Sequence, residues 1–296
     1  MNKEHSAAVL KAKGRYQHVI DNIDQLPSLP AIVSRLLQVV NCPDTSAEDA
    51  AELIEKDPAL TSRMLRLANS AFYGIPRSIS SVSSAVVILG FNTIRSLVLS
   101  ASVVKMFSGA KPFFDNDRFW KHSIVTAIAS KTIIRHFMSV RMMDPESAFC
   151  SGILHDIGKL IFSFYVPEEY MEACEYACKH SVSLIDAENH ILGINHAEIG
   201  KILADKWALP LDLSNCLVYH HSPEKSDIAS DLVSTVHLGD IMAHKLGCDL
   251  WDGEIRVEES ASSREILNIS QTEYDKIMDK LQDSVEKSTE FLSIIK

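Results

Sequence analysis

Apolar residues near the start of the chain recur at intervals of three and four positions. Within residues 31–41 these apolar positions are Ile32, Val33, Leu36, Leu37 and Val40. Such spacing places their side chains on one face of a helix. The preceding Pro30 fits the first turn, where a helix tolerates proline. We therefore predict an amphipathic helix over residues 31–41.

Helix start and stop signals divide the rest of the chain in the same way. Thr45 with Glu48 and Ser46 with Asp49 both match a capping box, and either pair would start a helix that runs to about residue 56. Further boundaries are predicted at Asp57-Pro58, Gly90-Phe91-Asn92, Asp144-Pro145, Gly193-Ile194-Asn195 and, for the last helix, after Ser270 to Glu273.

Strand signals are weak in comparison. The β-branched stretch over residues 85–89 could be a strand in isolation. No alternating pattern bounded by hairpin turns occurs anywhere in the chain, however. The sequence therefore predicts an all-α fold, a multi-helical bundle.

Composition and charge narrow the classes of function. The chain has 296 residues, of which 46% are hydrophobic and 23% charged, and this balance is typical of a globular protein with a sizeable core. A net charge of −10 repels polyanions, so we expect no nucleic-acid partner. No apolar stretch suits a signal peptide or a membrane helix, which predicts a cytoplasmic protein without membrane contact.

Histidine and aspartate side chains supply the candidate chemistry. Adjacent His155 and Asp156 offer an imidazole nitrogen and a carboxylate from one helical turn. Such a pair can coordinate one ion from two directions, and a carboxylate can bridge two ions with its two oxygens. A single histidine on an apolar helix is usually a core or surface group, so the pair alone does not establish a metal site.

The motif Gly152-Ile-Leu-His-Asp-Ile-Gly-Lys159 resembles the HD superfamily of metal-dependent phosphohydrolases. In that superfamily a histidine, a His-Asp doublet, further histidines and a last aspartate follow one another in order. The same order is filled here by His122, His155, Asp156, His196, His220, His221 and Asp240. The resemblance implies one metal ion held by His122, His155, Asp156 and Asp240. It implies a second ion held by His196, His220 and His221, with Asp156 as the bridge.

Lys159 extends this resemblance toward the dinuclear phosphodiesterase branch of the superfamily, which has a lysine at this place. It lies three residues after Asp156 and would hold a phosphate oxygen, although a surface lysine is an alternative interpretation. The implied cofactor is one or two divalent ions, with iron, manganese, zinc and nickel all compatible with imidazole ligands. If the protein is an enzyme, Asp156 and Lys159 are its expected catalytic residues.

Four motifs in the first half resemble the HDOD domain, an HD-related output domain of bacterial signalling. They are Leu26-Pro-Ser-Leu-Pro30, the stretches over residues 54–63 and 67–74, and the stretch over residues 85–95 that contains Leu89-Gly90-Phe91. The resemblance covers residues 18–245. It implies an HD-like bundle with an N-terminal HDOD lobe. We expect an N-terminal extension (1–17), this lobe (18–110), a metal-binding lobe (111–246) and a C-terminal helical extension (247–296).

Two functions follow from these resemblances. The first is a regulatory signal-transduction protein whose metal site binds a phosphorylated small molecule or nucleotide, with input from a signalling partner of unknown identity. The second is an active metal-dependent phosphohydrolase or phosphodiesterase. Hydrolysis of cyclic-di-GMP is disfavoured, because Ser222-Pro-Glu-Lys-Ser226 stands where the enzymes of that branch have a Gly-Tyr-Pro motif.

The remaining histidines have no place in the ligand order and are expected to be structural. They are His5, His18, His136, His180, His190, His237 and His244. Several carboxylates are expected to be helix caps or solvated groups, namely Asp144, Glu146, Asp186, Glu188 and Glu198.

Overall fold

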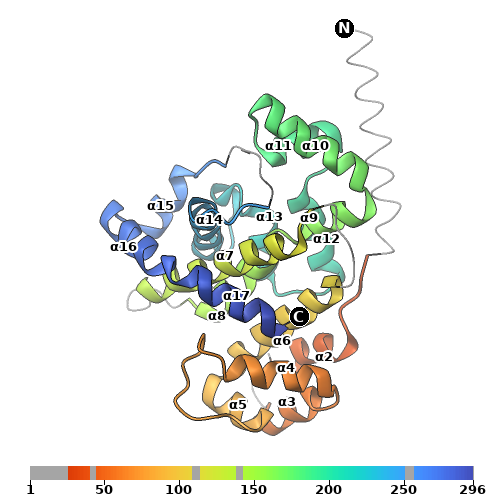
Figure 1. The fold of residues 1–296 in the computed structure, drawn as a ribbon, viewed down its shortest axis with the longest axis vertical. Helices are drawn as coiled ribbons and strands as arrows, with labels where there is room; N and C mark the ends of the chain where they lie inside the picture. The colour runs from red at the N-terminus through yellow and green to blue at the C-terminus, as the bar shows by residue number, and fades with distance from the viewer. Residues whose placement is uncertain (1–25, 41–44, 109–113, 138–142, 251–256, 296) are drawn as a thin grey trace.

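The computed structural model describes residues 26–40, 45–108, 114–137, 143–250 and 257–295. All regular secondary structure in these ranges is helical (Figure 1), so the predicted all-α fold is confirmed. The stretch over residues 85–89 belongs to helix α5 (Val82–Leu89) and not to a strand. Within the same ranges, no helix is both long enough and apolar enough to cross a membrane.

Four short helices form an N-terminal lobe at the lower end of the molecule in Figure 1. They are α2 (Ala31–Val40), α3 (Ala47–Ile54), α4 (Pro58–Ala68) and α5. The longer α6 (Phe91–Ser108) packs on this lobe through α2, α4 and α5, and it also contacts α8 (Pro145–Leu154) of the second lobe. Helix α6 therefore connects the two lobes.

The start of α3 shows which of the two predicted capping boxes forms. The Ser46 hydroxyl accepts the Asp49 backbone N–H at 3.1 Å, and the Asp49 carboxylate accepts the Ser46 backbone N–H at 2.9 Å. The Thr45 hydroxyl instead donates to the Val39 carbonyl at 2.6 Å. The box at Thr45 and Glu48 is therefore not formed.

Other boundaries also follow the local signals. The Asp57 carboxylate caps α4 by accepting two backbone N–H groups of its first turn, and Asp144 caps α8 in the same way. Gly90 ends α5 with a φ of 84°, a conformation that costs glycine little, and α6 begins at the next residue. Cap and stop residues therefore predicted these ends correctly.

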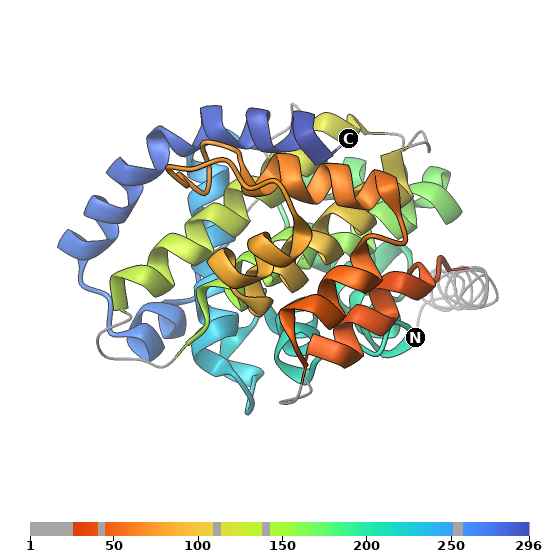
Figure 2. The same cartoon turned by 90° about the horizontal axis from the view of Figure 1, so that it is seen from below.

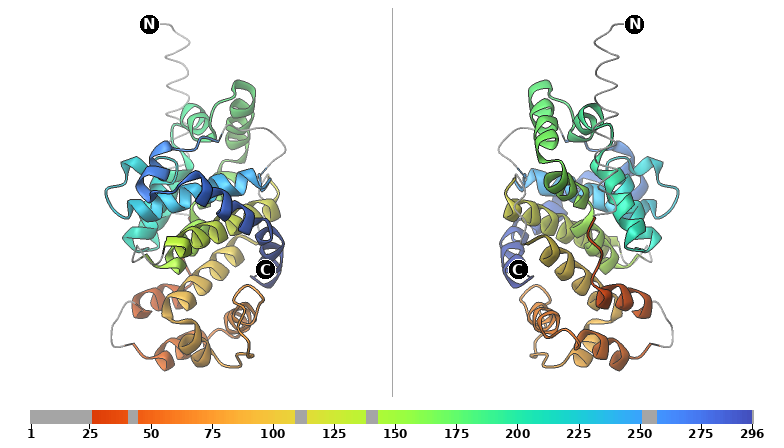
Figure 3. Two further views of the ribbon diagram at one scale, coloured as in Figure 1. Left: turned by 90° about the vertical axis from the view of Figure 1, so that its left-hand side faces the viewer. Right: turned by 90° about the vertical axis from the view of Figure 1, so that its right-hand side faces the viewer.

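The second lobe is built around α7 (Asn116–Phe137), which packs along both α8 and α14 (Ser230–Lys245). Helices α10 (Pro167–His180) and α11 (Leu184–Ile191) form a hairpin that projects at the top of Figures 1 and 3. The other elements of this lobe are α9 (Ile157–Tyr165), α12 (His196–Lys206), α13 (Leu211–Tyr219) and the short 3-10 helix η2 (Pro223–Lys225).

The C-terminal segment packs on both lobes. It contains α15 (Ala261–Leu267), α16 (Gln271–Gln282) and α17 (Ser284–Ile295), so two helices follow the predicted capping box at Ser270 where one was expected. Helix α17 contacts α7 and α4, and it lies beside α4 in Figure 2. Its Phe291 is fully buried, with its ring centroid 5.4 Å from the rings of both Phe72 and Phe149. Residues 1–17 lie outside the described ranges, and the predicted domain boundaries stay a prediction.

Candidate metal centre

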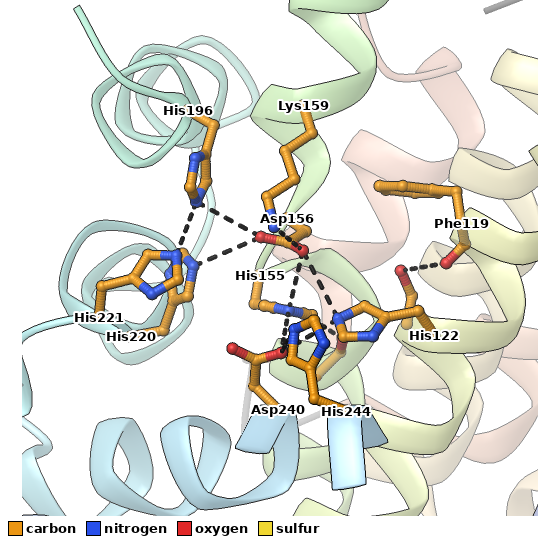
Figure 4. A network of polar contacts seen from close by, with 12 residues as sticks. Phe119, His122, His155, Asp156, Lys159, His196, His220, His221, Asp240 and His244 are labelled. Carbon is orange, nitrogen blue, oxygen red and sulfur yellow. Dashed lines mark hydrogen bonds and ion pairs between the residues drawn. The ribbon is translucent and has the colours of Figure 1, made fainter. Parts of the chain in front are cut away.

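The predicted metal ligands come from five helices and converge at one place in the second lobe (Figure 4). His122 projects from α7, while His155 and Asp156 occupy the junction between α8 and α9. His196 is the first residue of α12, and Asp240 belongs to α14. The remaining two, at the end of α13, are His220 and His221.

A first ligand group consists of His122, His155 and Asp240, whose ligand atoms all lie within 4.8 Å of one another. Asp240 Oδ1 is 3.1 Å from His122 Nε2 and 3.7 Å from His155 Nε2. Asp156 Oδ2 faces the same group, at 3.3 Å from His155 Nε2 and 3.6 Å from His122 Nε2. Two imidazoles and two carboxylates could therefore hold one ion.

A second ligand group consists of Asp156, His196, His220 and His221, again within 4.8 Å of one another. Asp156 Oδ1 is 3.4 Å from His196 Nε2 and 3.5 Å from His220 Nε2. The Nε2 atoms of His196 and His221 are 2.9 Å apart. The two oxygens of Asp156 thus face different groups, as a bridging carboxylate requires.

Most of these imidazoles are held through Nδ1, so that Nε2 points to the centre. Main-chain carbonyls accept the Nδ1–H of three of them, at 2.8 to 3.1 Å, in the pairs His122 with Cys248, His155 with Gly152 and His220 with Cys216. The fourth, His196, is held by the Glu188 carboxylate at 2.6 Å. Such outer partners fix the tautomer and ring orientation of metal-binding histidines.

Several ligand atoms of the centre are buried without any hydrogen-bond partner. They are Nε2 of His122, His155 and His220 and Oδ1 of Asp156 and Asp240. Each buried, unsatisfied polar atom costs about 1–3 kcal/mol, and a bound ion would remove that cost. In addition, two imidazole nitrogens that each lie about 2.1 Å from one ion, at a right angle to each other, are ~3.0 Å apart. This separation is close to the 2.9 Å between the Nε2 atoms of His196 and His221. The residues present therefore fit a divalent metal ion.

The charge states in the second ligand group also suit metal binding. Burial acts to raise the pKa of Asp156, but the charges of His155 and Lys159 outweigh it and hold this pKa well below its ordinary value. Burial lowers the pKa of His220 to about 4 and lowers that of His221 well below its ordinary value. The bridging residue is therefore an anion at neutral pH, and both imidazoles are neutral.

Metal uptake should release protons and weaken as the pH falls. Burial acts to lower the pKa of His155, but Asp156 and Asp240 outweigh it and raise this pKa to about 10. Below that pH the imidazole carries a proton that an ion must displace, so affinity should rise with pH up to about 10. Titration of the metal-free protein with Zn²⁺ in weak buffer should therefore acidify the solution at pH 8. An unchanged affinity between pH 6 and pH 8 would contradict this prediction.

Comparison with known proteins identifies the family. A model of the HDOD domain matches residues 26–223. The chain belongs to the HDOD family. A protein of Treponema pallidum (strain Nichols), named only as uncharacterized, is 25% identical over 242 residues, which make up 81% of this chain and 45% of that relative. The HDOD chain therefore spans less than half the length of this curated relative.

Two solved structures resemble this HDOD chain over almost its whole length. An HDOD domain protein of unknown function from Geobacter sulfurreducens has a TM-score of 0.78 and 25% identity, covering 96% of this chain and 99% of its own. A protein from Shewanella amazonensis SB2B, named as a candidate phosphohydrolase, has a TM-score of 0.72 and 27% identity, covering 94% and 98%. The resemblance stated from the sequence motifs is thus confirmed.

Two glycines of the HDOD chain let the ligand-bearing helices approach α7. A Cβ atom on Gly152 of α8 would lie 2.5 Å from the Ala127 Cα atom. A Cβ atom on Gly239 of α14 would lie 2.5 Å from Ser130 Oγ and 2.9 Å from a carbonyl oxygen of α7. These close approaches bring α8 and α14 against α7, so that His155 and Asp240 reach His122.

Lys159 is buried beside the bridging carboxylate. Its Nζ atom lies 2.6 Å from Asp156 Oδ2, and the residue is 5% exposed. The alternative of a surface lysine is therefore wrong. Its role as a phosphate ligand stays a prediction.

Sequence reasoning missed two residues at the centre. Glu188 was expected to be a cap or a solvated group, but it is fully buried against His196. His244 was expected to be structural, but its Nε2 lies 3.4 Å from Asp240 Oδ1 and its Nδ1 lies 2.5 Å from Asp249 Oδ1. The spacing of four residues between Asp240 and His244 on one helix could have revealed the second case.

The other histidines in the described ranges lie apart from the ligand groups. His237 donates to the His220 carbonyl at 2.7 Å and accepts the Ser260 backbone N–H at 2.8 Å, a structural role as expected. His180 and His190 stack on the two sides of a tyrosine ring, and His136 pairs with Glu273. Two more, His5 and His18, lie outside the described residues.

Of the other carboxylates that were expected to be caps or solvated groups, Glu198 agrees with the prediction and Glu146 does not. Glu198 completes a capping box with Asn195, as expected of a helix cap. Glu146, in contrast, forms a buried ion pair with Lys131 at 2.5 Å. The prediction for Glu146 was therefore wrong, because tertiary packing buries the first turn of α8.

Proposed function

We propose that this HDOD chain binds two divalent metal ions and uses them to bind a phosphorylated small molecule, as a regulatory protein of a signalling pathway. The observation that carries the proposal is the division of the ligand atoms into two groups that share the two oxygens of Asp156. A carboxylate placed in this way suits two ions better than one.

Anionic ligands suit the surroundings of the bridge. When bound, a pair of divalent ions supplies positive charge, polarises a phosphoryl oxygen and lowers the pKa of water. The Lys159 ammonium adds a buried positive charge next to Asp156, where it can hold a phosphate oxygen. Both features favour a phosphorylated ligand.

Access to the centre favours a small ligand. His122, His155, Asp156, His196 and His220 are fully buried. Next to these residues, His221 and His244 are partly exposed. A ligand would therefore enter beside these two residues, with only its phosphate reaching the ions.

A regulatory role is supported by the domain arrangement. The HDOD match begins at residue 26 and covers the whole N-terminal lobe as well as most of the metal-binding lobe. Helix α6 contacts both α4 and α8, so a partner that binds the N-terminal lobe has a structural connection to the helix that ends at His155. We propose a signalling protein as this partner.

An active phosphohydrolase is the second candidate. It is favoured by the likeness to the Shewanella amazonensis SB2B protein named as a candidate phosphohydrolase. In phosphoester hydrolysis, Asp156 would set the distance between the two ligand groups. Lys159 would offset the negative charge that develops on the phosphoryl oxygens.

Metal analysis combined with turnover assays separates the two candidates. The purified protein should contain close to two equivalents of divalent metal and bind inorganic phosphate only when metal is present. Hydrolysis of bis(p-nitrophenyl) phosphate and of phosphomonoesters, lost after chelation, would establish the enzyme instead. A protein that takes up no iron, manganese, zinc or nickel would contradict both proposals.

A further inference from the structure

The α10–α11 hairpin places one buried carboxylate, that of Glu188, next to the metal centre. In Figure 3 the hairpin projects from the bundle, and its two helices pack against each other while α10 contacts α9. Glu188, in the middle of α11, is nevertheless fully buried because its side chain is turned toward the start of α12. Burial of a carboxylate is costly unless it is paired or hydrogen-bonded, so its partners reveal its role.

Glu188 Oε2 accepts two hydrogen bonds, and both come from His196. Its Oε2 atom accepts the His196 backbone N–H at 2.9 Å and the His196 Nδ1–H at 2.6 Å. Helix α12 already has a complete capping box from Asn195 and Glu198, so the start of this helix does not depend on Glu188 for a cap. The contact to the imidazole is therefore the distinctive one.

This contact determines which nitrogen of His196 carries the proton. A carboxylate has no hydrogen to donate, so Nδ1 must be the donor, and Nε2 of the neutral ring keeps its lone pair. That lone pair faces His221 Nε2 at 2.9 Å and Asp156 Oδ1 at 3.4 Å, inside the second ligand group. The ring is thus held in the tautomer that a metal ion requires.

The surroundings of Glu188 keep it in place. Burial, reinforced by the charge of Glu188, raises the pKa of Tyr170 well above its ordinary value, so a neutral phenol lies beside the carboxylate. Lys159 lies close enough for the charge of Glu188 to contribute to its raised pKa. Tyr170 and Lys159 therefore both lie near the buried Glu188 side chain.

His196 differs in this respect from the other oriented ligands. Main-chain carbonyls hold Nδ1 of His122, His155 and His220, whereas a carboxylate oxygen holds Nδ1 of His196. A carboxylate partner makes the imidazole a stronger donor to a metal ion than a neutral partner does.

We propose that Glu188 is a positioning residue that sets the metal affinity of the second ligand group through the tautomer and orientation of His196. The effect on affinity rests on the proposed function, because it presupposes that this group binds an ion. The effect on the tautomer does not, since it concerns the metal-free protein.

The first test measures the His196 tautomer in metal-free protein by ¹⁵N NMR of the histidine rings. The wild type should show His196 protonated at Nδ1. In Glu188→Met, an unbranched side chain without an oxygen to accept Nδ1–H, this preference should be lost, while the His122 and His220 signals stay unchanged. An unchanged His196 tautomer in the variant would overturn the inference, whatever the protein does with metal.

The second test titrates the same proteins with Co²⁺, whose visible spectrum reports the ligands of each ion. In Glu188→Met, one of the two equivalents should bind ~10–100-fold more weakly, the usual effect of losing an outer partner of a ligating histidine. The other equivalent should keep its affinity and spectrum. Equal weakening of both equivalents, or of neither, would contradict a role specific to the second group.

Glu198→Met is the matched control. It changes a carboxylate at the start of the same helix, but Glu198 is exposed and accepts only the Asn195 backbone N–H. Both equivalents should bind to this variant as in the wild type. If the wild type takes up no Co²⁺ although Glu188→Met shifts the tautomer, the proposed function fails and the positioning of His196 by Glu188 stands.

Discussion

Asp156→Ala is expected to abolish tight binding of both metal ions, and not of one alone. The Asp156 carboxylate faces the first ligand group through Oδ2 and the second through Oδ1, so its loss removes a ligand from each. Affinity for both equivalents should fall by more than ~100-fold, because loss of a hydrogen-bond partner of a metal ligand already lowers affinity by up to ~100-fold. Isothermal titration of the metal-free protein with Zn²⁺ measures the change.

The same substitution should also destabilise the metal-free protein. Lys159 is buried and pairs with Asp156 at 2.6 Å, so Asp156→Ala leaves a buried ammonium without its partner. Removal of one partner of a buried ion pair lowers the free energy of unfolding by roughly 3–5 kcal/mol. The double variant Asp156→Ala with Lys159→Met should recover part of this loss in thermal unfolding.

Asp205→Ala is a suitable control for Asp156→Ala. Asp205 is an exposed carboxylate of α12 that pairs with Lys201 on the surface. Its loss should change neither metal affinity nor stability by a measurable amount. Retention of one tightly bound ion in Asp156→Ala would show that Asp156 serves a single ligand group.

Gly158→Ala is expected to separate α9 from α12 and to displace His196. A Cβ atom at this position would lie 2.0 Å from the His196 carbonyl oxygen and 2.8 Å from its carbonyl carbon. These are backbone atoms, so no side-chain rotation relieves the clash and the start of α12 must move. Overpacking of this kind costs typically about 1–3 kcal/mol, and metal affinity of the second group should fall with it. Thermal unfolding and Co²⁺ titration measure the two effects.

Gly200→Ala, in α12, provides the comparison. A Cβ atom on Gly200 would lie 3.3 Å from the Leu217 Cβ atom, a side-chain contact that a small shift can relieve. This variant should therefore lose less stability than Gly158→Ala and keep its metal affinity. Equal losses in both variants would argue against a specific contact between Gly158 and His196.

Local signals in the sequence predicted most helix starts. Ser46 and Asp57 cap their helices through side-chain oxygens that accept first-turn N–H groups, an interaction contained within a few residues. The choice between the boxes at Thr45 and Ser46 was not local, because it depended on a hydrogen bond from Thr45 to Val39 of the preceding helix.

The order of candidate ligands could be read from the sequence through its resemblance to the HD superfamily, whereas their geometry could not. Convergence of His122, His155 and Asp240 depends on the close approach of α8 and α14 to α7, which Gly152 and Gly239 permit. Glycine occurs in helices for several reasons, so its presence in the sequence does not show which other helix packs against it.

The sequence by itself determined the all-α class, the family and the candidate metal ligands, because periodicity, caps and ordered motifs can be recognised without knowledge of contacts between helices. Only the tertiary structure decided that Asp156 divides its oxygens between two groups, that Lys159 is buried, and that Glu188 orients His196. These properties depend on contacts between helices that are distant along the chain, and burial is what gives such contacts their strength.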